Sequence, residues 1–169
     1  MTSRVTERLH IRHSPDDIYR LIGDVRSYPR FISLISALRV TDTQEIASGR
    51  ILTAEAVARY KMVSERFVTR VTLDDAARTI VVNLIKGPFK SLVNCWKIQP
   101  LSDGSSLVDF DIKFEFSNPM LNMLLNANKD RAISMIIRAF EAEADRLFTI
   151  VGDESVDLSA EIKTLDGIA

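Results

Sequence analysis

The sequence predicts an α+β fold in which a seven-stranded antiparallel sheet curves around one long carboxy-terminal helix. Apolar residues recur with a period of two in six consecutive segments between residues 37 and 116, and turn residues separate these segments. Another alternating segment occupies residues 4–11. From Asn118 the apolar residues take the spacing of a helix and keep it to Leu147. These observations predict a sheet that packs one face against a long helix.

Length and composition favour one soluble globular domain. The chain has 169 residues, of which 46% are hydrophobic and 27% charged, with a net charge of −1. This charge gives no reason to expect DNA as a partner. Cys95 is the single cysteine and His10 and His13 are the two histidines, so neither a disulfide framework nor a metal centre is expected. Without a signal peptide or an apolar run of ~18 residues, a cytoplasmic protein is expected.

The first strand is expected at Arg4–Ile11, followed by two short helices. Ser14 can cap a helix whose first residue is Pro15 and which ends near Val25. The stretch Ser27-Tyr28-Pro29 should break this helix, and the second short helix should cover residues 30–35. The remaining strands are expected at Ala37–Gln44, Arg50–Met62, Val63–Leu73, Thr79–Ile85, Leu92–Gln99 and Ser106–Phe116.

The long helix should close the fold on the apolar face of the last strand. In that strand the apolar residues alternate with charged ones, which indicates one packed face and one wet face. Residues 1–150 are therefore expected to form one domain of the helix-grip type. The acidic residues 151–169 lose the pattern and are expected to be a flexible tail with one weak helical turn near residues 158–165.

The space between such a sheet and its helix can hold a ligand when the inward side chains are small. On the strand after Arg50, side chains alternate between the two faces of the sheet. Glu55 is expected to face outward, so Ala54, Ala56 and Ala58 should face inward. This row predicts an apolar small-molecule pocket. A close approach of the helix to the sheet would also produce such a row, so a filled core is the alternative. The expected wall residues are Leu52, Ala54, Ala56, Ala58, Tyr60, Phe67, Thr69, Val71, Val82, Leu84, Asn94, Trp96, Phe110, Ile112, Phe114, Ile136 and Phe140.

Tyr60, Asn94 and Thr69 are the polar members of this wall. We expect them to meet the polar head of a ligand, while the apolar residues hold its chain. Asn94 and Trp96 also suit an ordinary core in which each polar group has a hydrogen-bond partner.

Several stretches of the chain resemble the coenzyme Q-binding START-like family, which is grouped with polyketide cyclase/dehydrase proteins and ribosome association toxins. They are Tyr28-Pro29-Arg30-Phe31, "AEAVARYKMVSERFVTRVTLD", "GPFKSLVNCWKI", "VDFDIKFEF" and "AFEAEADRLF", and the likeness covers residues 3–148. It implies a START-like domain that binds ubiquinone or a related prenyl lipid without catalysis and supports respiratory electron transport as a carrier or chaperone. The chain departs from the family pattern at Ser33-Leu34-Ile35, at Lys86 and at Glu143, where the family has Pro-Trp-Cys, an acidic residue and an arginine.

The turn Lys86-Gly87-Pro88-Phe89-Lys90 carries a phenylalanine between two lysines, where a polar tip is usual. For a lipid carrier, we expect this loop at the cavity mouth, in brief contact with an anionic inner membrane. One lysine near such a surface is worth ~1 kcal/mol, and a buried phenylalanine ring ~2 kcal/mol. Alternatively, Phe89 folds inward over the start of the long helix, against Met120 or Leu124.

An enzyme of the cyclase or dehydratase type is the first rival. Such an enzyme needs a titratable group inside the pocket. By parity, Asp109, Asp111 and Glu115 face outward, and Glu65 faces inward only at a strand end. Both histidines are expected at the surface. Catalysis is therefore not expected.

A ribosome-associated protein, as in the toxin branch of the family, is the second rival. Arg59, Lys61, Arg66 and Arg70 are expected on the outer face of two neighbouring strands, where they could meet RNA phosphates. Charges on a strand face also protect a sheet from pairing with other chains, so a solvated surface is the alternative.

Overall fold

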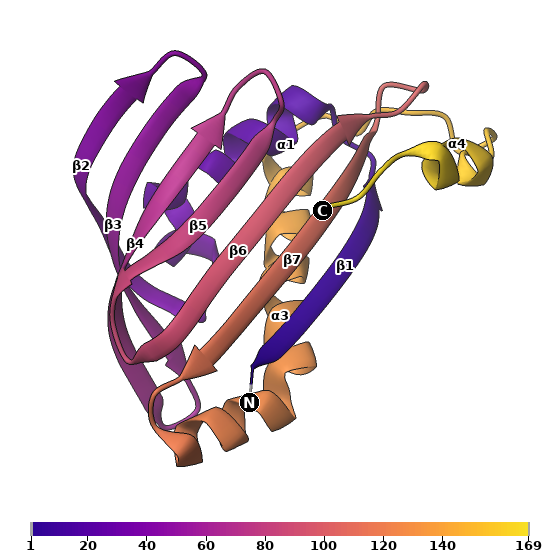
Figure 1. Ribbon diagram of the computed structural model, residues 1–169. Coiled ribbons are helices and arrows are strands. Elements are labelled where there is room, and N and C mark those ends of the chain that lie inside the picture. Colours follow the sequence, from indigo (N-terminus) through magenta and orange to yellow (C-terminus); the bar gives the residue numbers. More distant parts are fainter. Residues whose placement is uncertain (1, 169) are drawn as a thin grey trace.

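The computed structural model describes residues 2–168 and contains one antiparallel sheet of seven strands (Figure 1). The strands are β1 Ser3–Ile11, β2 Ile35–Ile46, β3 Gly49–Tyr60, β4 Val63–Asp74, β5 Thr79–Lys86, β6 Phe89–Pro100 and β7 Ser106–Phe116. Their order across the sheet is β1-β7-β6-β5-β4-β3-β2. The six strands after β1 therefore form a meander, and β1 closes the sheet beside β7.

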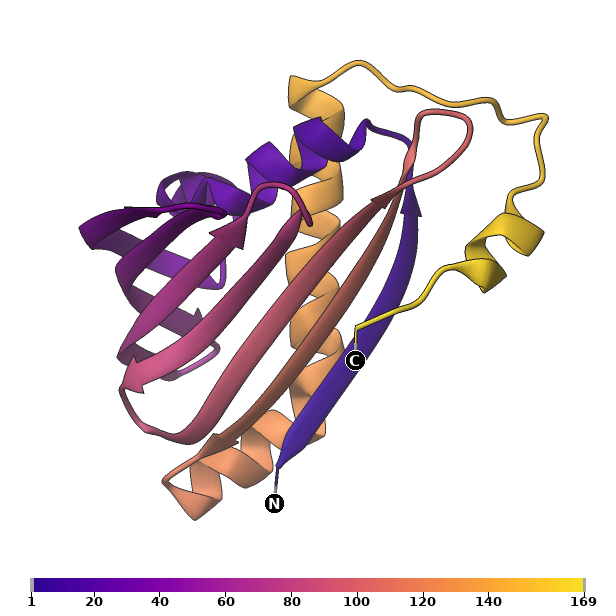
Figure 2. The same ribbon diagram turned by 45° about the horizontal axis from the view of Figure 1, so that its top comes forward.

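The long helix α3, Pro119–Leu147, lies across the concave side of this sheet (Figures 1 and 2). Its amino end is capped by Asn118, whose side-chain oxygen accepts from the backbone N–H groups of Met120 and Leu121 at 2.9 and 3.2 Å. The helix turns Ile137 and Phe140 toward the sheet, and both are nearly fully buried. The predicted helix-grip fold, with its curved sheet and long helix, is confirmed.

Helix α1, Pro15–Gly23, begins as predicted, with the Ser14 hydroxyl accepting from the backbone of Asp17 at 3.2 Å. The prediction for the second short helix was wrong in position. A 3-10 turn, η1, covers Val25–Ser27, and helix α2 covers Tyr28–Phe31. Pro29 lies in the first turn of α2, where its fixed φ favours a helix, so the stretch that should have ended a helix begins one.

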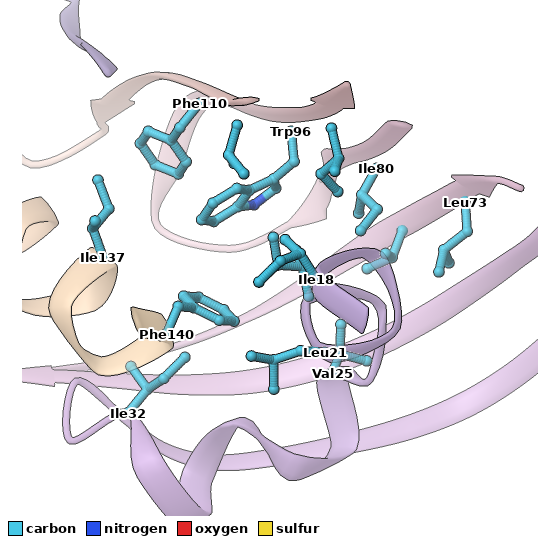
Figure 3. Packing of buried hydrophobic residues seen from close by; sticks show 14 of the residues in the cluster. Ile18, Leu21, Val25, Ile32, Leu73, Ile80, Trp96, Phe110, Ile137 and Phe140 are labelled. Atoms are coloured by element: carbon cyan, nitrogen blue, oxygen red, sulfur yellow. The ribbon is translucent and has the colours of Figure 1, made fainter. Parts of the chain in front are cut away.

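The main core lies where α1 and α3 meet the sheet. Figure 3 shows Ile18 and Leu21 of α1 near Trp96 of β6 and Phe140 of α3. These side chains fill one end of the concave side. None of the helices within residues 2–168 has a stretch long and apolar enough to cross a bilayer.

The carboxy-terminal residues pack on the outside of the sheet, away from α3 (Figure 2). A short helix α4, Ser159–Thr164, follows Leu158, which is 6% exposed and contacts Leu101 and Leu107. The guanidinium of Arg8 donates to the carbonyl oxygens of Ile162 and Leu165 at 3.2 and 2.8 Å. The segment therefore packs on the sheet, whereas a flexible tail was expected. Leu158, Ile162 and Leu165 of this acidic segment pack with Leu101 and Leu107.

Two other expectations about exposure were wrong. Asp109 and Asp111 point to the outer face of β7, but they are only 5% and 8% exposed because Arg8 and Arg4 of β1 cover them. His13 is 2% exposed instead of lying at the surface. It lies beside the end of α3, where its Nε2 is 2.8 Å from a carboxylate oxygen of Asp145.

Candidate functional site: an apolar cavity between the sheet and α3

A cavity of about 280 Å³ lies beneath the alanine row of β3. Ala54, Ala56 and Ala58 alternate with outward residues along this strand, and the first two are almost fully buried. Because their side chains end at Cβ, the sheet and α3 leave space where larger residues would fill a core. The cavity, and not a close approach of the helix, is what the alanine row produces.

The structure places all but two of the expected wall residues on this cavity. Those on the wall are Ala54, Ala56, Ala58, Tyr60, Phe67, Thr69, Val71, Val82, Asn94, Trp96, Phe110, Ile112, Phe114, Ile136 and Phe140. Leu52 and Leu84 do not reach it. Leu52 lies at the end of the sheet that α1 fills and is part of the main core. Leu84 packs beside Leu92, Phe114 and Phe116 in a second apolar cluster.

Another group of wall residues lies outside the strands whose parity predicted the cavity. The helical segments, the turn after α2 and strand β2 contribute Val25, Tyr28, Ile32, Leu34, Ile35 and Leu38, and α3 adds Leu125, Ala132 and Ile133. The α3 residues have the i, i+7, i+8 spacing of one helix face, which is a signal that the sequence does contain. The contribution of β2 and α2 depends on how far the sheet curves, which no local pattern specifies.

Aromatic rings close the cavity at two places. Near α1, Trp96 lies between Phe110 and Phe140, with ring centroids 4.6 and 5.2 Å away (Figure 3). Near the start of α3, Phe89 lies between Phe67 and Phe116, at 5.4 and 4.3 Å. These edge-to-face and tilted contacts fix the rings, so the cavity walls are largely preformed.

Phe89 is therefore a wall residue and the first residue of β6, not the tip of the turn. The Gly87-Pro88 turn lies directly over Phe67, because a Cβ on Gly87 would be only 2.6 Å from the Cβ of Phe67. Lys86 and Lys90 are exposed, and the Lys90 ammonium lies 3.4 Å from Glu115. Phe89 packs inward as in the alternative interpretation, although its ring partners are Phe67 and Phe116. Met120, an expected contact, is 79% exposed.

Most polar atoms of the wall bond within the protein. The amide of Asn94 donates to the carbonyl of Asp111 at 3.0 Å, and its oxygen accepts from the indole N–H of Trp96 at 3.0 Å. The Thr69 hydroxyl donates to the Ala54 carbonyl at 3.5 Å, a long contact. Of the three expected head-group residues, Tyr60 differs: its hydroxyl oxygen is buried and has no hydrogen-bond partner within residues 2–168.

Two charged residues of the β3–β4 hairpin also reach the wall. Arg59 is exposed and Glu65 is half-buried. The parity of Glu65 indicated that it faces inward, but its position at the end of a strand did not predict that it lines the cavity. No group of histidine, cysteine and acidic side chains within residues 2–168 is arranged to hold a metal ion. The site can therefore surround an apolar molecule and offer a few polar contacts at one end.

The chain is similar to proteins whose names describe different roles. It is 28% identical to the ribosome association toxin RatA of Escherichia coli K12 over 82% of this chain and 85% of that protein. It is 26% identical to the mitochondrial coenzyme Q-binding protein coq10 of Schizosaccharomyces pombe, over 78% and 80% of the two chains.

Solved structures repeat the fold. The 18 kDa protein CC1736 of Caulobacter crescentus is 37% identical, with a TM-score of 0.72 over 87% of this chain and 97% of that one. The ZhuI aromatase/cyclase of Streptomyces sp. R1128 has a TM-score of 0.73 over 86% and 95% at 15% identity, which shows the fold alone. The family model for polyketide cyclase/dehydrase and lipid transport matches residues 11–141. This chain belongs to that family.

Proposed function

We propose that this protein binds ubiquinone or a related prenyl lipid in the cavity, without catalysis, and acts as a quinone carrier or chaperone in respiratory electron transport. The observation that carries the proposal is the preformed apolar cavity beneath Ala54, Ala56 and Ala58. The likeness to a coenzyme Q-binding protein supports the choice of ligand.

The size of the cavity limits which part of the lipid it holds. Its volume of about 280 Å³ is just below the ~300–1,000 Å³ that is usual for small-molecule pockets. This space suits a substituted ring and the first part of a prenyl chain. The rest of the chain would leave through the opening and lie on the protein surface or in a membrane.

Mass spectrometry of lipid extracted from the gently purified protein tests this function. We expect near-stoichiometric quinone in the wild type and its loss in Ala56→Phe, which places a ring in the cavity. Val57→Phe, on the opposite face of the same strand, is the matched control and should keep the lipid. Wild-type protein that is empty, and that also takes up no added short-chain quinone, would refute quinone binding.

Brief contact with a membrane is part of this proposal, because a quinone carrier must exchange its ligand there. Phe89 is packed inward, so the apolar contact is assigned instead to Met62 at the β3–β4 turn, which is 98% exposed. Its neighbour Lys61 is exposed as well and can meet anionic head groups. One methionine and a lysine permit transient docking only, which makes the protein peripheral.

Ribosome association is a second candidate, favoured by the outer face of β3 and β4. Arg66 and Arg70 are exposed there, and Arg59, which also reaches the cavity wall, is exposed on the same hairpin; none of the three makes an ion pair within residues 2–168. Glu55, which would weaken their field, is held by Arg39 at 2.6 Å. We expect co-sedimentation with ribosomes that falls steeply with salt and with Arg66→Ala/Arg70→Ala if this candidate is right.

Catalysis is not proposed, because the wall offers few groups for acid–base chemistry. The Tyr28 hydroxyl already donates to the carbonyl of Ile22, and burial raises its pKa above the ordinary value. Asn94 and Trp96 bond to each other. These residues do not supply a general acid and a general base, and the remaining polar groups of the wall, Glu65 and the Tyr60 hydroxyl, are assigned to ligand binding.

A further inference from the structure

Two partly buried polar side chains of the cavity wall have no hydrogen-bond or ion-pair partner within residues 2–168. The Tyr60 hydroxyl is buried without a hydrogen bond, which is costly for a polar group. The Glu65 carboxylate is half-buried on the same wall and makes neither a hydrogen bond nor an ion pair. Asn94 and Thr69, in contrast, are engaged by the protein. A ligand that enters the cavity therefore meets one unpaired hydroxyl and one unpaired carboxylate that are partly buried, whereas Arg59, the other unpaired polar side chain of the wall, is exposed.

These two side chains lie close together on the concave side of the β3–β4 hairpin. Tyr60 pairs with Val63 in the strand ladder, and Ala58 pairs with Glu65. Tyr60 and Glu65 are therefore diagonal neighbours across the two strands, a relation that places Cα atoms ~7–8 Å apart and lets long side chains meet. Ala58 leaves the space beside them open.

The hydrogen-bonding chemistry of this pair distinguishes the two redox forms of a quinone. An ionised carboxylate only accepts hydrogen bonds, whereas a phenolic hydroxyl can donate or accept. The oxidised ring carries carbonyl oxygens, which only accept, so a carbonyl beside Glu65 would place two acceptors together. The reduced ring carries hydroxyls, which can donate to Glu65 and accept from Tyr60.

Resting on the proposed quinone binding, we propose that Glu65, with Tyr60, makes the cavity select the reduced quinol over the oxidised quinone. The protein supplies no electrons in this scheme and only binds the two forms of a couple that other reactants interconvert. A hydrogen bond to a charged group justifies a preference on the order of tenfold. By linkage, this would raise the two-electron potential of the bound couple by about 30 mV.

Equilibrium dialysis under argon tests the proposal with decylubiquinone and its borohydride-reduced quinol. Chromatography then measures the concentration of each form on both sides of the dialysis membrane. We expect the wild type to bind the quinol about tenfold more tightly. Glu65→Gln should bring the two affinities within about twofold, because an amide can also donate to a carbonyl. Glu45→Gln, the same change at an exposed position of β2, should keep the wild-type ratio.

Each other outcome overturns the proposal in a recognisable way. Equal affinities in the wild type, unchanged in Glu65→Gln, would remove any role of Glu65 in selection while quinone binding stands. Tighter binding of the oxidised form would indicate that a donor such as Arg59, and not Glu65, contacts the head group. Binding of neither form would refute the proposed function itself. Thermal melting of each variant, followed by circular dichroism, separates these results from a loss of folding.

Discussion

The indole N–H of Trp96 donates to the side-chain oxygen of Asn94, 3.0 Å away on the same strand. Asn94 in turn donates to the carbonyl of Asp111 on β7. The most polar side chain that the sequence places on the cavity wall thus holds a tryptophan in position and joins two strands. Its hydrogen bonds orient the wall, so the proposed contacts with a ligand head are assigned to Tyr60 and Glu65.

We therefore predict that Asn94→Leu lowers stability more than it lowers ligand affinity. The change leaves the buried indole N–H of Trp96 without its partner and removes the link to Asp111, at a cost of ~1–3 kcal/mol in the free energy of unfolding. Urea unfolding followed by Trp96 fluorescence measures this cost, and dialysis with a short-chain quinone measures affinity. Asn83→Leu, on the outer face of β5, is the control. An unchanged unfolding curve with lost ligand binding would instead make Asn94 a head-group contact.

A second prediction concerns acid stability and Glu143, where the family pattern has arginine. The hydrogen bond from Arg146 lowers the pKa of Glu143, burial opposes this, and the charges of Arg146 and Arg30 add to the lowering. Arg30 belongs to α2, so the 3.6 Å ion pair joins α2 to α3. Since the pKa is lowered in the folded state, this stabilisation is present above the unfolded pKa of about 4.3 and is lost as the pH falls through the folded value.

Glu143→Gln should accordingly be less stable than the wild type at neutral pH, and the difference should shrink as the pH falls below about 4.3. Urea unfolding between about pH 3 and 7 measures the two curves. Glu141→Gln changes an exposed residue of the same helix, and its free energy of unfolding should depend on pH as that of the wild type does. Parallel curves for Glu143→Gln as well would show that the pair contributes nothing to folding.

Much of the fold was predictable because strand and helix periods are local properties. The alternation along β7 and the alanines of β3 specify which faces are buried, whatever the rest of the chain does. Contacts between distant segments were less predictable. The tail after residue 150 docks through Leu158, but its composition is that of a disordered segment. Asp109 has outward parity, and only the neighbouring Arg8 decides that it is covered.

The cavity, like the fold, was predictable where it depends on local periodicity and not where it depends on contacts between segments. Parity identified most of the sheet wall, but not which polar groups remain unpaired. Asn94 and Tyr60 share the inward direction, and only the fold reveals that one has partners and the other has none. For Phe89, a turn sequence suggested an exposed tip, yet the strand begins at that residue and turns the ring inward.

The third prediction is that the carboxy-terminal segment contributes to stability through Leu158. This side chain is 6% exposed and covers Leu107, which is 1% exposed. Leu158→Ala should release α4 from the sheet, because a buried leucine cut to alanine loses ~2–5 kcal/mol of packing where the surroundings cannot collapse. Hydrogen exchange of residues 159–165 and limited proteolysis measure the release. Val156→Ala, at a 45% exposed position, is the control. Unaltered protection of α4 in Leu158→Ala would mean that its polar contacts with Arg8 and Ser102 hold it.

The fourth prediction tests the membrane contact at the β3–β4 turn. Met62→Asp removes a fully exposed apolar side chain and places a negative charge beside Lys61, so binding to vesicles containing anionic lipid should fall by roughly tenfold or more. Flotation with vesicles of phosphatidylcholine and phosphatidylglycerol measures this binding. Raising the salt concentration should reduce the binding of the wild type toward that of the variant. Val156→Asp makes the same kind of change outside the sheet, in the tail, and should bind like the wild type. If Met62→Asp and the wild type bind equally, the membrane contact lies elsewhere, and exposed Met120 and Met123 at the start of α3 become the next positions to change.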